Sequence, residues 1–364
     1  MMSKQRQPID KVFLTLVLVE LFFGFVMLTS ASGPLSYGRF RSSWTYALHQ
    51  LEGGIIPGLF FLWLFSRLDY RRWQRWAPQI LLAALALMVL VFIPGVSAGY
   101  GTANHWIMIG NYFSVQPVEV LKLAIIIYLA ALASKGRAPK EIFMPSVLAF
   151  GAGAVLLMLQ PDMGSLIIIA AIFMIMIYSA GVPLAYLAGL AVVGTGASFA
   201  FARSASYRAA RLMVFLHPEL DPQGIGYHIN QAFLAIGSGG WFGLGLGQSR
   251  QKYSYLPEVM SDSIFPIIAE ELGFFFALAL VVLIAVIFFR GLKIAKETRD
   301  PFGRLVAIGV VGWLVVQSFL NIAAMLGLVP LTGVPLPLVS YGGTAMVMSL
   351  CSIGIVLSIS KVRG

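Results

Sequence analysis

Charged residues and cysteines are scarce in this sequence. Only 11% of the 364 residues are charged, compared with about 25% in ordinary soluble domains. The single cysteine, Cys351, excludes an internal disulfide and a metal site built from thiolates. The four histidines show neither the HExxH pattern nor a closely paired spacing. We therefore predict structural or interfacial roles for them and no metal site formed by protein residues.

Long apolar runs take up most of the chain, in which 59% of the residues are hydrophobic. Each run of about 20 residues can cross a hydrocarbon core about 30 Å thick. We predict one all-α polytopic membrane domain over residues 1–364, with ten transmembrane helices. The expected spans are 12–32, 46–66, 78–98, 117–134, 143–160, 164–181, 183–202, 264–289, 304–326 and 338–360. No small-residue cleavage site follows the first run, so we expect it to stay as an anchor.

The basic residues are distributed unevenly over this predicted topology. With a cytoplasmic N-terminus, 17 of the 25 Lys and Arg residues fall on the cytoplasmic side, 7 fall outside, and one lies within a span. This bias follows the positive-inside rule and predicts that both termini are cytoplasmic. The net charge of +10 is explained by this topology and by attraction to anionic lipid, so we predict no nucleic-acid partner.

Two connections on the predicted outer side are unusual, and the shorter of them is 99–116. The longer one, at about 203–263, is a large extracellular loop between the seventh and eighth spans, and loops of this length are usually functional. Within it, YHINQAFLAIGSGG predicts a short amphipathic or re-entrant helix that ends at a glycine cap. Before the last span, PLTGVPLPLVSYGGTA predicts irregular backbone, which is tolerated where it lines a cavity or packs within protein.

Two ionisable residues lie inside a predicted span, where charge is costly and often functional. Glu119 and Lys122 are three residues apart, so they share a helix face and can neutralise each other. They form either a structural ion pair or a polar site in which Lys122 contacts a substrate phosphate. Asp162 precedes another span, where it either caps that helix or contributes to substrate binding.

Asp262 is the strongest candidate for a catalytic residue. It precedes the eighth span and could cap that helix, but its loop is rich in charge. The charged residues upstream of it in the loop include Arg203, Arg208, Arg211, Arg250, Lys252 and Glu258. A carboxylate at the edge of a basic outer loop suits a general base that acts on an anionic, lipid-linked substrate. Arginine side chains would hold a pyrophosphate leaving group, and we predict that Glu258 and Lys252 also bind substrate.

The glycine run GSGGWFGLGLG lies upstream of Asp262. It lacks both the GK[ST] ending and the strand–turn–helix context of a nucleotide-binding loop, so we exclude nucleotide binding. Glu270 and Glu271 follow Asp262 by about two turns and face different sides of the helix. We expect at least one of them to point inward.

These motifs occur together, in order, in one known family. The sequence resembles the SEDS family of bacterial cell-wall synthesis, the FtsW, RodA and SpoVE proteins, from about Trp106 to Ser360. The segments that carry the resemblance are LQPDMGS, FLHPELDPQGIGYHINQAFLAIGSGGWFGLGLGQSRQKYSYLPE, SDSIFPIIAEELGF and PLTGVPLPLVSYGGT. Of these, GLGQSRQKYSYLPE looks more like the division-type FtsW branch than RodA.

The resemblance implies ten spans and peptidoglycan glycosyltransfer, in which lipid II is polymerised and undecaprenyl pyrophosphate leaves. It places the family's essential loop aspartate at Asp262. It places other motif residues at Glu119, Lys122, Asp162, Arg208 and Arg211. Two departures stand out: Met260 and Ser261 replace the usual His-Thr pair, so no histidine contribution is expected there. In addition, Asn104, His105 and Trp106 stand where the family often has Arg-Trp.

The implied partner is a single-span class B penicillin-binding transpeptidase, because the chain has no SxxK motif of its own. Other divisome or elongasome membrane proteins are expected beside it. Carboxylates and pyrophosphate suit Mg²⁺ or Mn²⁺, but the sequence requires no cofactor. The alternatives are a lipid II flippase without chemistry, for which Glu119 and Lys122 would line the path, and a scaffold that only recruits partners.

Overall fold

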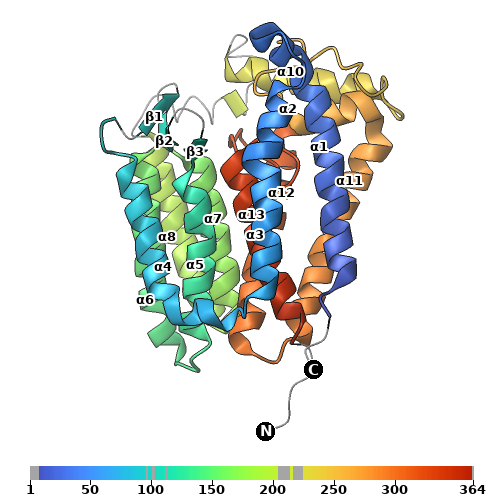
Figure 1. Ribbon diagram of the computed structural model, residues 1–364. Coiled ribbons are helices and arrows are strands. Elements are labelled where there is room, and N and C mark those ends of the chain that lie inside the picture. The colour runs from blue at the N-terminus through green and yellow to red at the C-terminus, as the bar shows by residue number, and fades with distance from the viewer. Residues whose placement is uncertain are drawn as a thin grey trace.

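The computed structural model describes residues 8–95, 97–100, 103–110, 113–203, 214–215 and 224–362. Most of this part is helical, and the long helices stand side by side in one bundle (Figure 1). The helices are α1 (Lys11–Phe40), α2 (Thr45–Gln50), the π-helix η1 (Leu51–Ile55), α3 (Ile56–Arg67), α4 (Arg71–Leu90), α5 (Pro117–Ala133), α6 (Pro139–Leu159), α7 (Met163–Ser179), α8 (Leu184–Arg203), α10 (Ile225–Gly239), α11 (Ile264–Glu297), α12 (Pro301–Met325) and α13 (Gly343–Ser360).

Seven helical segments of the described residues are long and apolar enough to cross a membrane. They are α1, the continuous segment Thr45–Arg67, α4, α6, α11, α12 and α13, and α7 is a shorter apolar helix. The prediction of a polytopic, mainly α-helical membrane protein is confirmed. Each of the ten expected ranges overlaps a helix, but the number of ten spans stays a prediction, since α5 and α7 have only 17 residues each.

Two local predictions differ from the structure. The third span, expected at 78–98, is the helix α4 at Arg71–Leu90. The predicted start was too late because we began the span at the apolar run, after the arginines of the first turns. These arginines belong to the helix, since long basic side chains near a helix end can reach water. The connection after it contains an antiparallel sheet of β1 (Ser97–Tyr100), β2 (Ala103–Ile109) and β3 (Phe113–Val115), for which we predicted no strands.

The helices at the centre of the bundle are α5, α12 and α13 (Figure 1). Almost every side chain of α5 is buried, and most of those of α12 and α13 are buried as well. A helix that is apolar on all sides is expected in such a place. By contrast, α1, α4 and α6 expose large hydrophobic side chains, such as Phe22, Leu82 and Leu148, which suits an outer ring facing lipid.

Helix α10 lies across one end of the bundle, opposite to the end where α1 begins and α13 stops (Figure 1). This confirms the short helix that the sequence predicts within the long loop. It ends at Gly240, which has a φ of 53°, in the left-handed region that favours glycine. The start of α1 and the end of α13 lie at the same end of the bundle, as an even number of spans requires.

The glycine run after α10 packs against a break in α11. Gly273 interrupts that helix with a φ of 79°, and the exposed backbone binds the loop: Leu244 N donates to Glu270 O at 2.9 Å and Phe274 N donates to Gly240 O at 2.9 Å. A Cβ on Gly243 or Gly273 would collide with the facing backbone. The glycines therefore allow two backbones to touch, a structural role for the run.

Candidate active site

Asp262 lies at the end of a tight turn that leads into α11. The backbone N–H groups of Ser261 and Ser263 both donate to the carbonyl of Glu258, at 3.1 and 3.2 Å. Glu258 adopts a φ of 51°, a conformation that costs energy for a residue with a side chain. The turn directs the side chain of Asp262 inward, where it is only 8% exposed.

Helix α12 and the irregular segment before α13 hold this turn from the other side. Asn321 Nδ2 donates to the carbonyl oxygens of Asp262 and Val334, at 2.7 and 2.8 Å. The Ser340 hydroxyl donates to Ser261 O, and Tyr341 N donates to Met260 O at 2.8 Å. The irregular backbone predicted before the last span thus packs within the protein, and it positions the turn that carries Asp262.

The two oxygens of the Asp262 carboxyl group lie in different surroundings. Its Oδ1 atom is buried and accepts no hydrogen bond from the residues that the structure describes. Gly333 faces the other oxygen, and a Cβ built there would lie 3.9 Å from Oδ2. Burial, and then the nearby negative charge of Glu258, raise the pKa of Asp262 to about 7. A carboxyl with this pKa can accept and release a proton near neutral pH.

A histidine reaches this turn from α10. His228 Nε2 lies 2.6 Å from Ser263 Oγ, and Ser263 is fully buried next to Asp262. Burial lowers the pKa of His228, while Glu258 acts in the opposite direction, so its imidazole is neutral at pH 7. Positions 260 and 261 carry no histidine, as the sequence shows, but His228 reaches the same turn from another element, and its place in the sequence gave no sign of this contact.

Glu119 and Lys122 form the ion pair that the sequence predicts. Lys122 Nζ lies 2.6 Å from Glu119 Oε1, and the two side chains are 1% and 2% exposed. Lys122 also donates to Gln317 Oε1 at 2.8 Å and lies 5.1 Å from the centre of the Trp313 ring. The second oxygen of Glu119 is buried and has no hydrogen-bond partner among the described residues. This pair is built into the core of the bundle.

Polar side chains of α12 connect the ion pair to Asp262. Gln317 contacts Lys122 and donates to Pro335 O at 2.9 Å. One turn later, Asn321 holds Val334 and Asp262 through their carbonyl groups. The segment at 334–335 is therefore bound at two adjacent points by one helix face. Sequence reasoning missed Gln317 and Asn321, although two amides four residues apart in an apolar helix were a usable signal.

Asp162 caps α7, one of the two roles that the sequence left open. Its Oδ1 atom accepts a hydrogen bond from Ser165 N at 2.9 Å, which satisfies a free N–H group of the first turn. In the same turn, Gly164 lies against the carbonyl of Thr332 so closely that a Cβ would not fit. The start of α7 thus packs on the irregular segment that also supports Asp262.

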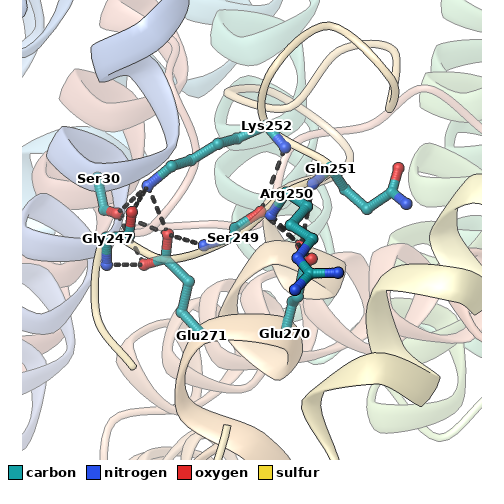
Figure 2. A network of polar contacts seen from close by, with 8 residues as sticks. All are labelled: Ser30, Gly247, Ser249, Arg250, Gln251, Lys252, Glu270 and Glu271. Carbon is teal, nitrogen blue, oxygen red and sulfur yellow. Dashed lines mark hydrogen bonds and ion pairs between the residues drawn. The ribbon is translucent and has the colours of Figure 1, made fainter. Parts of the chain in front are cut away.

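A second polar network, separate from these contacts, fixes the loop after the glycine run (Figure 2). Lys252 Nζ lies 2.7 Å from Glu271 Oε1, and it also donates to Gly247 O at 2.8 Å and to Ser30 Oγ on α1 at 3.1 Å. All three ammonium protons have protein partners, and the side chain is 4% exposed. Lys252 therefore holds the loop to α1 and α11, and its contact with substrate stays a prediction.

Glu270 completes this network on the other side of the helix. It accepts hydrogen bonds from Arg250 N at 2.9 Å, from Gln251 N at 3.4 Å and from the Ser249 hydroxyl. Glu270 and Glu271 are both buried, so the expectation that at least one points inward is confirmed. Together they hold the loop by its backbone (Figure 2).

An apolar cavity of about 430 Å³ lies beside the turn, between α10, α11 and α12. Its lining includes Phe265, three residues after Asp262, and Ile322, the neighbour of Asn321. Trp241 and Phe274 form part of its rim and are 64% and 50% exposed. Cavities of about 300–1,000 Å³ are typical of small-molecule sites, and the residues that line this one are apolar.

The contacts described above include neither the two predicted arginines nor a metal site. Arg208 and Arg211 lie outside the described residues. Among the described side chains, no group of three or more His, Cys, Asp or Glu could hold a metal ion, so these residues do not fit a dedicated Mg²⁺ or Mn²⁺ site. Glu258 is exposed and accepts a hydrogen bond from Ser261 Oγ at 2.8 Å, which leaves it at the open side of the turn.

The fold and the site define a polytopic helical membrane protein with a buried, titratable carboxylate at one end of its bundle. The family model described as "Cell cycle protein", which covers FtsW, RodA and SpoVE, matches residues 10–363. The chain therefore belongs to the FtsW/RodA/SpoVE family.

Relatives and solved structures agree with this assignment. Stage V sporulation protein E of Bacillus subtilis (strain 168) is 35% identical over 367 residues, covering 99% of each chain. A probable peptidoglycan glycosyltransferase FtsW of Thioalkalivibrio sp. (strain K90mix) is 38% identical over 363 residues, covering 98% of this chain and 90% of the relative. The rod shape determining protein RodA of Thermus thermophilus has a similar structure, with a TM-score of 0.73 and 26% identity over 98% of this chain and 97% of that one.

One further similar structure comes from work on the structural coordination of polymerization and crosslinking by a peptidoglycan synthase complex. Its TM-score is 0.80, with 25% identity over 97% of each chain.

Proposed function

We propose that this protein is a glycosyltransferase of the bacterial cytoplasmic membrane that polymerises lipid II into glycan strands during cell-wall synthesis. Its family and the names of its relatives support this function. The structural observation that carries it is the buried carboxyl group of Asp262, with a pKa raised to about 7, at the turn that precedes an apolar cavity of α11. A titratable group and a hydrocarbon site together suit a reaction on a lipid-linked sugar.

In the proposed reaction, Asp262 accepts the proton of the 4-hydroxyl group of the acceptor sugar. The freed oxygen attacks the anomeric carbon of the lipid-linked donor, whose bond to the pyrophosphate breaks and leaves its electron pair on the pyrophosphate oxygen. The configuration inverts, and a β-1,4 bond forms. General base catalysis of this kind contributes about 10²–10⁴-fold to the rate.

Positive charge must stabilise the departing undecaprenyl pyrophosphate, and this is commonly the larger contribution. We assign it to Arg208 and Arg211, whose guanidinium groups can bind phosphate oxygens in pairs. Lys122 acts from the core, where Glu119 and Gln317 hold it. We place Glu258 at the acceptor sugar because its exposed carboxylate lies on the open side of the turn.

The apolar cavity suits the hydrocarbon chain of a lipid-linked substrate. It lies between α10, α11 and α12 and reaches Phe265 in the first turn of α11. A chain seated there would leave its pyrophosphate and sugars near Asp262. No step of the reaction is assigned to a metal ion, since the described side chains do not gather into a site for one.

We further propose a class B penicillin-binding transpeptidase as partner, together with other divisome or elongasome membrane proteins. The similar structure from a peptidoglycan synthase complex that coordinates polymerization and crosslinking supports such a pairing. In the proposed orientation both termini are cytoplasmic and Asp262 lies outside. The positive-inside bias of the sequence supports that arrangement.

The direct test is to incubate the purified protein and its transpeptidase with lipid II and to separate the products by size. Glycan ladders would support a polymerase. The absence of ladders, together with movement of lipid II across liposome membranes, would instead support a flippase. The buried pair Glu119 and Lys122 is the observation that favours this second function, because intramembrane charges mark translocation paths.

A further inference from the structure

Helix α10 is joined to the turn of Asp262 by one hydrogen bond. His228, in the first turn of α10, has its Nε2 atom 2.6 Å from Ser263 Oγ. Ser263 is completely buried and directly precedes α11, and its N–H group donates to Glu258 O at 3.2 Å. A shift of His228 would therefore move the residue next to Asp262.

The surroundings of His228 favour a fixed, neutral imidazole. The negative charge of Glu258, in the same turn, raises the pKa of both His228 and Asp262. Helix α12 contributes the neutral Asn321 to this region. Of the acidic residues of α11, Glu271 forms an ion pair with Lys252, and Glu270 accepts hydrogen bonds from the loop at 249–251.

The backbone of Asp262 is secured by Asn321, and its carboxyl group interacts with the side chains of Ser261 and Ser263, which lower its pKa by less than burial and Glu258 raise it. Oδ1 accepts no hydrogen bond from the described residues, so the direction of the carboxyl depends on the backbone on either side of it. The contacts of Met260 and Ser261 fix the N-terminal side, and Asn321 holds the carbonyl of Asp262 in the peptide bond that leads to Ser263. On the C-terminal side, the bond of Ser263 to His228 is the side-chain contact that reaches out of the turn.

We propose that His228 is a positioning residue of the candidate active site, which aligns the carboxyl group of Asp262 through its hydrogen bond to Ser263. By aligning the carboxyl group, this bond speeds the step in which Asp262 accepts the proton of the acceptor sugar. It makes α10 part of the catalytic apparatus, because a helix outside the bundle then determines the alignment of the base. The kinetic part of this inference rests on the proposed function.

The test compares His228→Ala, His228→Gln and Ser263→Ala in lipid II polymerisation. Misplacement of a reacting group by about 1 Å can cost about 10²-fold, so we expect kcat to fall roughly 10–100-fold in His228→Ala and in Ser263→Ala, with KM little changed. The amide of His228→Gln can replace Nε2 in the bond, so this variant should keep most of the wild-type kcat. The double variant His228→Ala/Ser263→Ala should be no slower than either single one, because both remove the same contact.

Ser238→Ala is the matched control on α10, because its hydroxyl bonds only within the helix, to Ala235 O at 2.9 Å. It should keep the wild-type kcat. Three results would each overturn the proposal: a wild-type kcat in His228→Ala, a His228→Gln variant as slow as His228→Ala, or losses that add in the double variant.

A second measurement does not depend on polymerisation. The amides of Ser261 and Ser263, both bonded to Glu258 O, should exchange hydrogen faster in His228→Ala but remain protected in His228→Gln. If the wild-type protein forms no glycan, the proposed function fails, while this exchange experiment still decides the positioning role. Equal protection in both variants and the wild type would reject that role.

Discussion

Asp262 is a residue whose placement costs stability. Burial and Glu258 raise its pKa to about 7 from an ordinary value of 3.8. The folded protein thus binds a proton that the unfolded chain releases between these two pH values. Stability therefore falls as the pH rises from about 4 to about 7, because the ionised carboxylate is held in a site that disfavours charge. Such a penalty is typical of functional rather than structural groups.

This cost predicts that Asp262→Asn is more stable than the wild type above pH 7. The shift from 3.8 to about 7, at about 1.4 kcal/mol per pKa unit, corresponds to a gain of up to about 4 kcal/mol at pH 8. Thermal unfolding in detergent at several pH values measures it. The difference should shrink toward pH 4, where the wild-type carboxyl is protonated. A variant equally stable at all pH values would show that Asp262 is not buried as described.

Sequence reasoning recognised the residues that carry charge and missed the neutral ones that position them. Asp262, Glu119 and Lys122 stood out because charge is rare in this chain. His228 and Asn321 did not, because their roles arise from contacts across 35 and 59 residues. Such distances are fixed by how helices pack. A single sequence does not display these contacts, although the spacing of Gln317 and Asn321 marks a polar face on α12.

At the level of elements, the break in α11 is the feature on which the outer loop depends. Gly273 leaves the helix with a positive φ and its backbone touches that of Phe242 and Gly243. The carbonyls freed by the break then bind the glycine run. Sequence analysis identified this run and excluded a nucleotide site. It did not predict the break in α11, because the hydrophobic pattern continues across Gly273.

Gly273→Ala should therefore destabilise the protein strongly. Its Cβ would collide with the backbone of the glycine run and would occupy a conformation that costs about 1 kcal/mol or more for non-glycine residues. Gly237→Ala in α10 is the control, since a Cβ there meets nothing within 4 Å, and it should gain about 0.5–1 kcal/mol of helix stability. Thermal midpoints compare the two, and equal midpoints would contradict the described packing.

The polar face of α12 makes a separate prediction. Asn321→Leu leaves the carbonyl oxygens of Asp262 and Val334 without their donor, at a cost of about 1–3 kcal/mol for each unsatisfied group. Both thermal stability and polymerisation should fall. Ser318→Ala is the control on the same helix, because its hydroxyl bonds only to Leu314 O of the preceding turn. If Asn321→Leu matched this control, α12 would not position Asp262.

For the whole molecule, the sequence was sufficient for the class of fold and insufficient for its details. Long apolar runs predicted a polytopic bundle with its ends on one side, and α1 and α13 agree with this. The predicted boundaries of the third span were wrong because arginines can belong to a spanning helix. The sheet at 97–115 was missed because two of its three strands have only four and three residues. Hydrophobicity locates spans, whereas backbone hydrogen bonding sets their ends.

The orientation of the molecule in the membrane can be tested by cysteine labelling. Cys351 is buried and can be replaced by serine, which leaves a chain without thiols. In spheroplasts, whose cytoplasmic membrane is intact, a membrane-impermeant maleimide should label Arg250→Cys in the outer loop. It should label Lys135→Cys, between α5 and α6, only after permeabilisation. The reverse pattern would contradict the proposed orientation and place Asp262 in the cytoplasm.

The central claim is that Asp262 is the base of a glycosyl transfer on lipid II. The measurement that tests it most directly is polymerisation by the wild-type protein and by Asp262→Asn, both with the transpeptidase and both shown to be folded by a cooperative thermal transition. The amide keeps the shape of the side chain and cannot accept the proton, so glycan ladders should form with the wild type and be absent with the variant. Ladders of equal yield from both proteins would contradict the account and remove Asp262 from the chemistry.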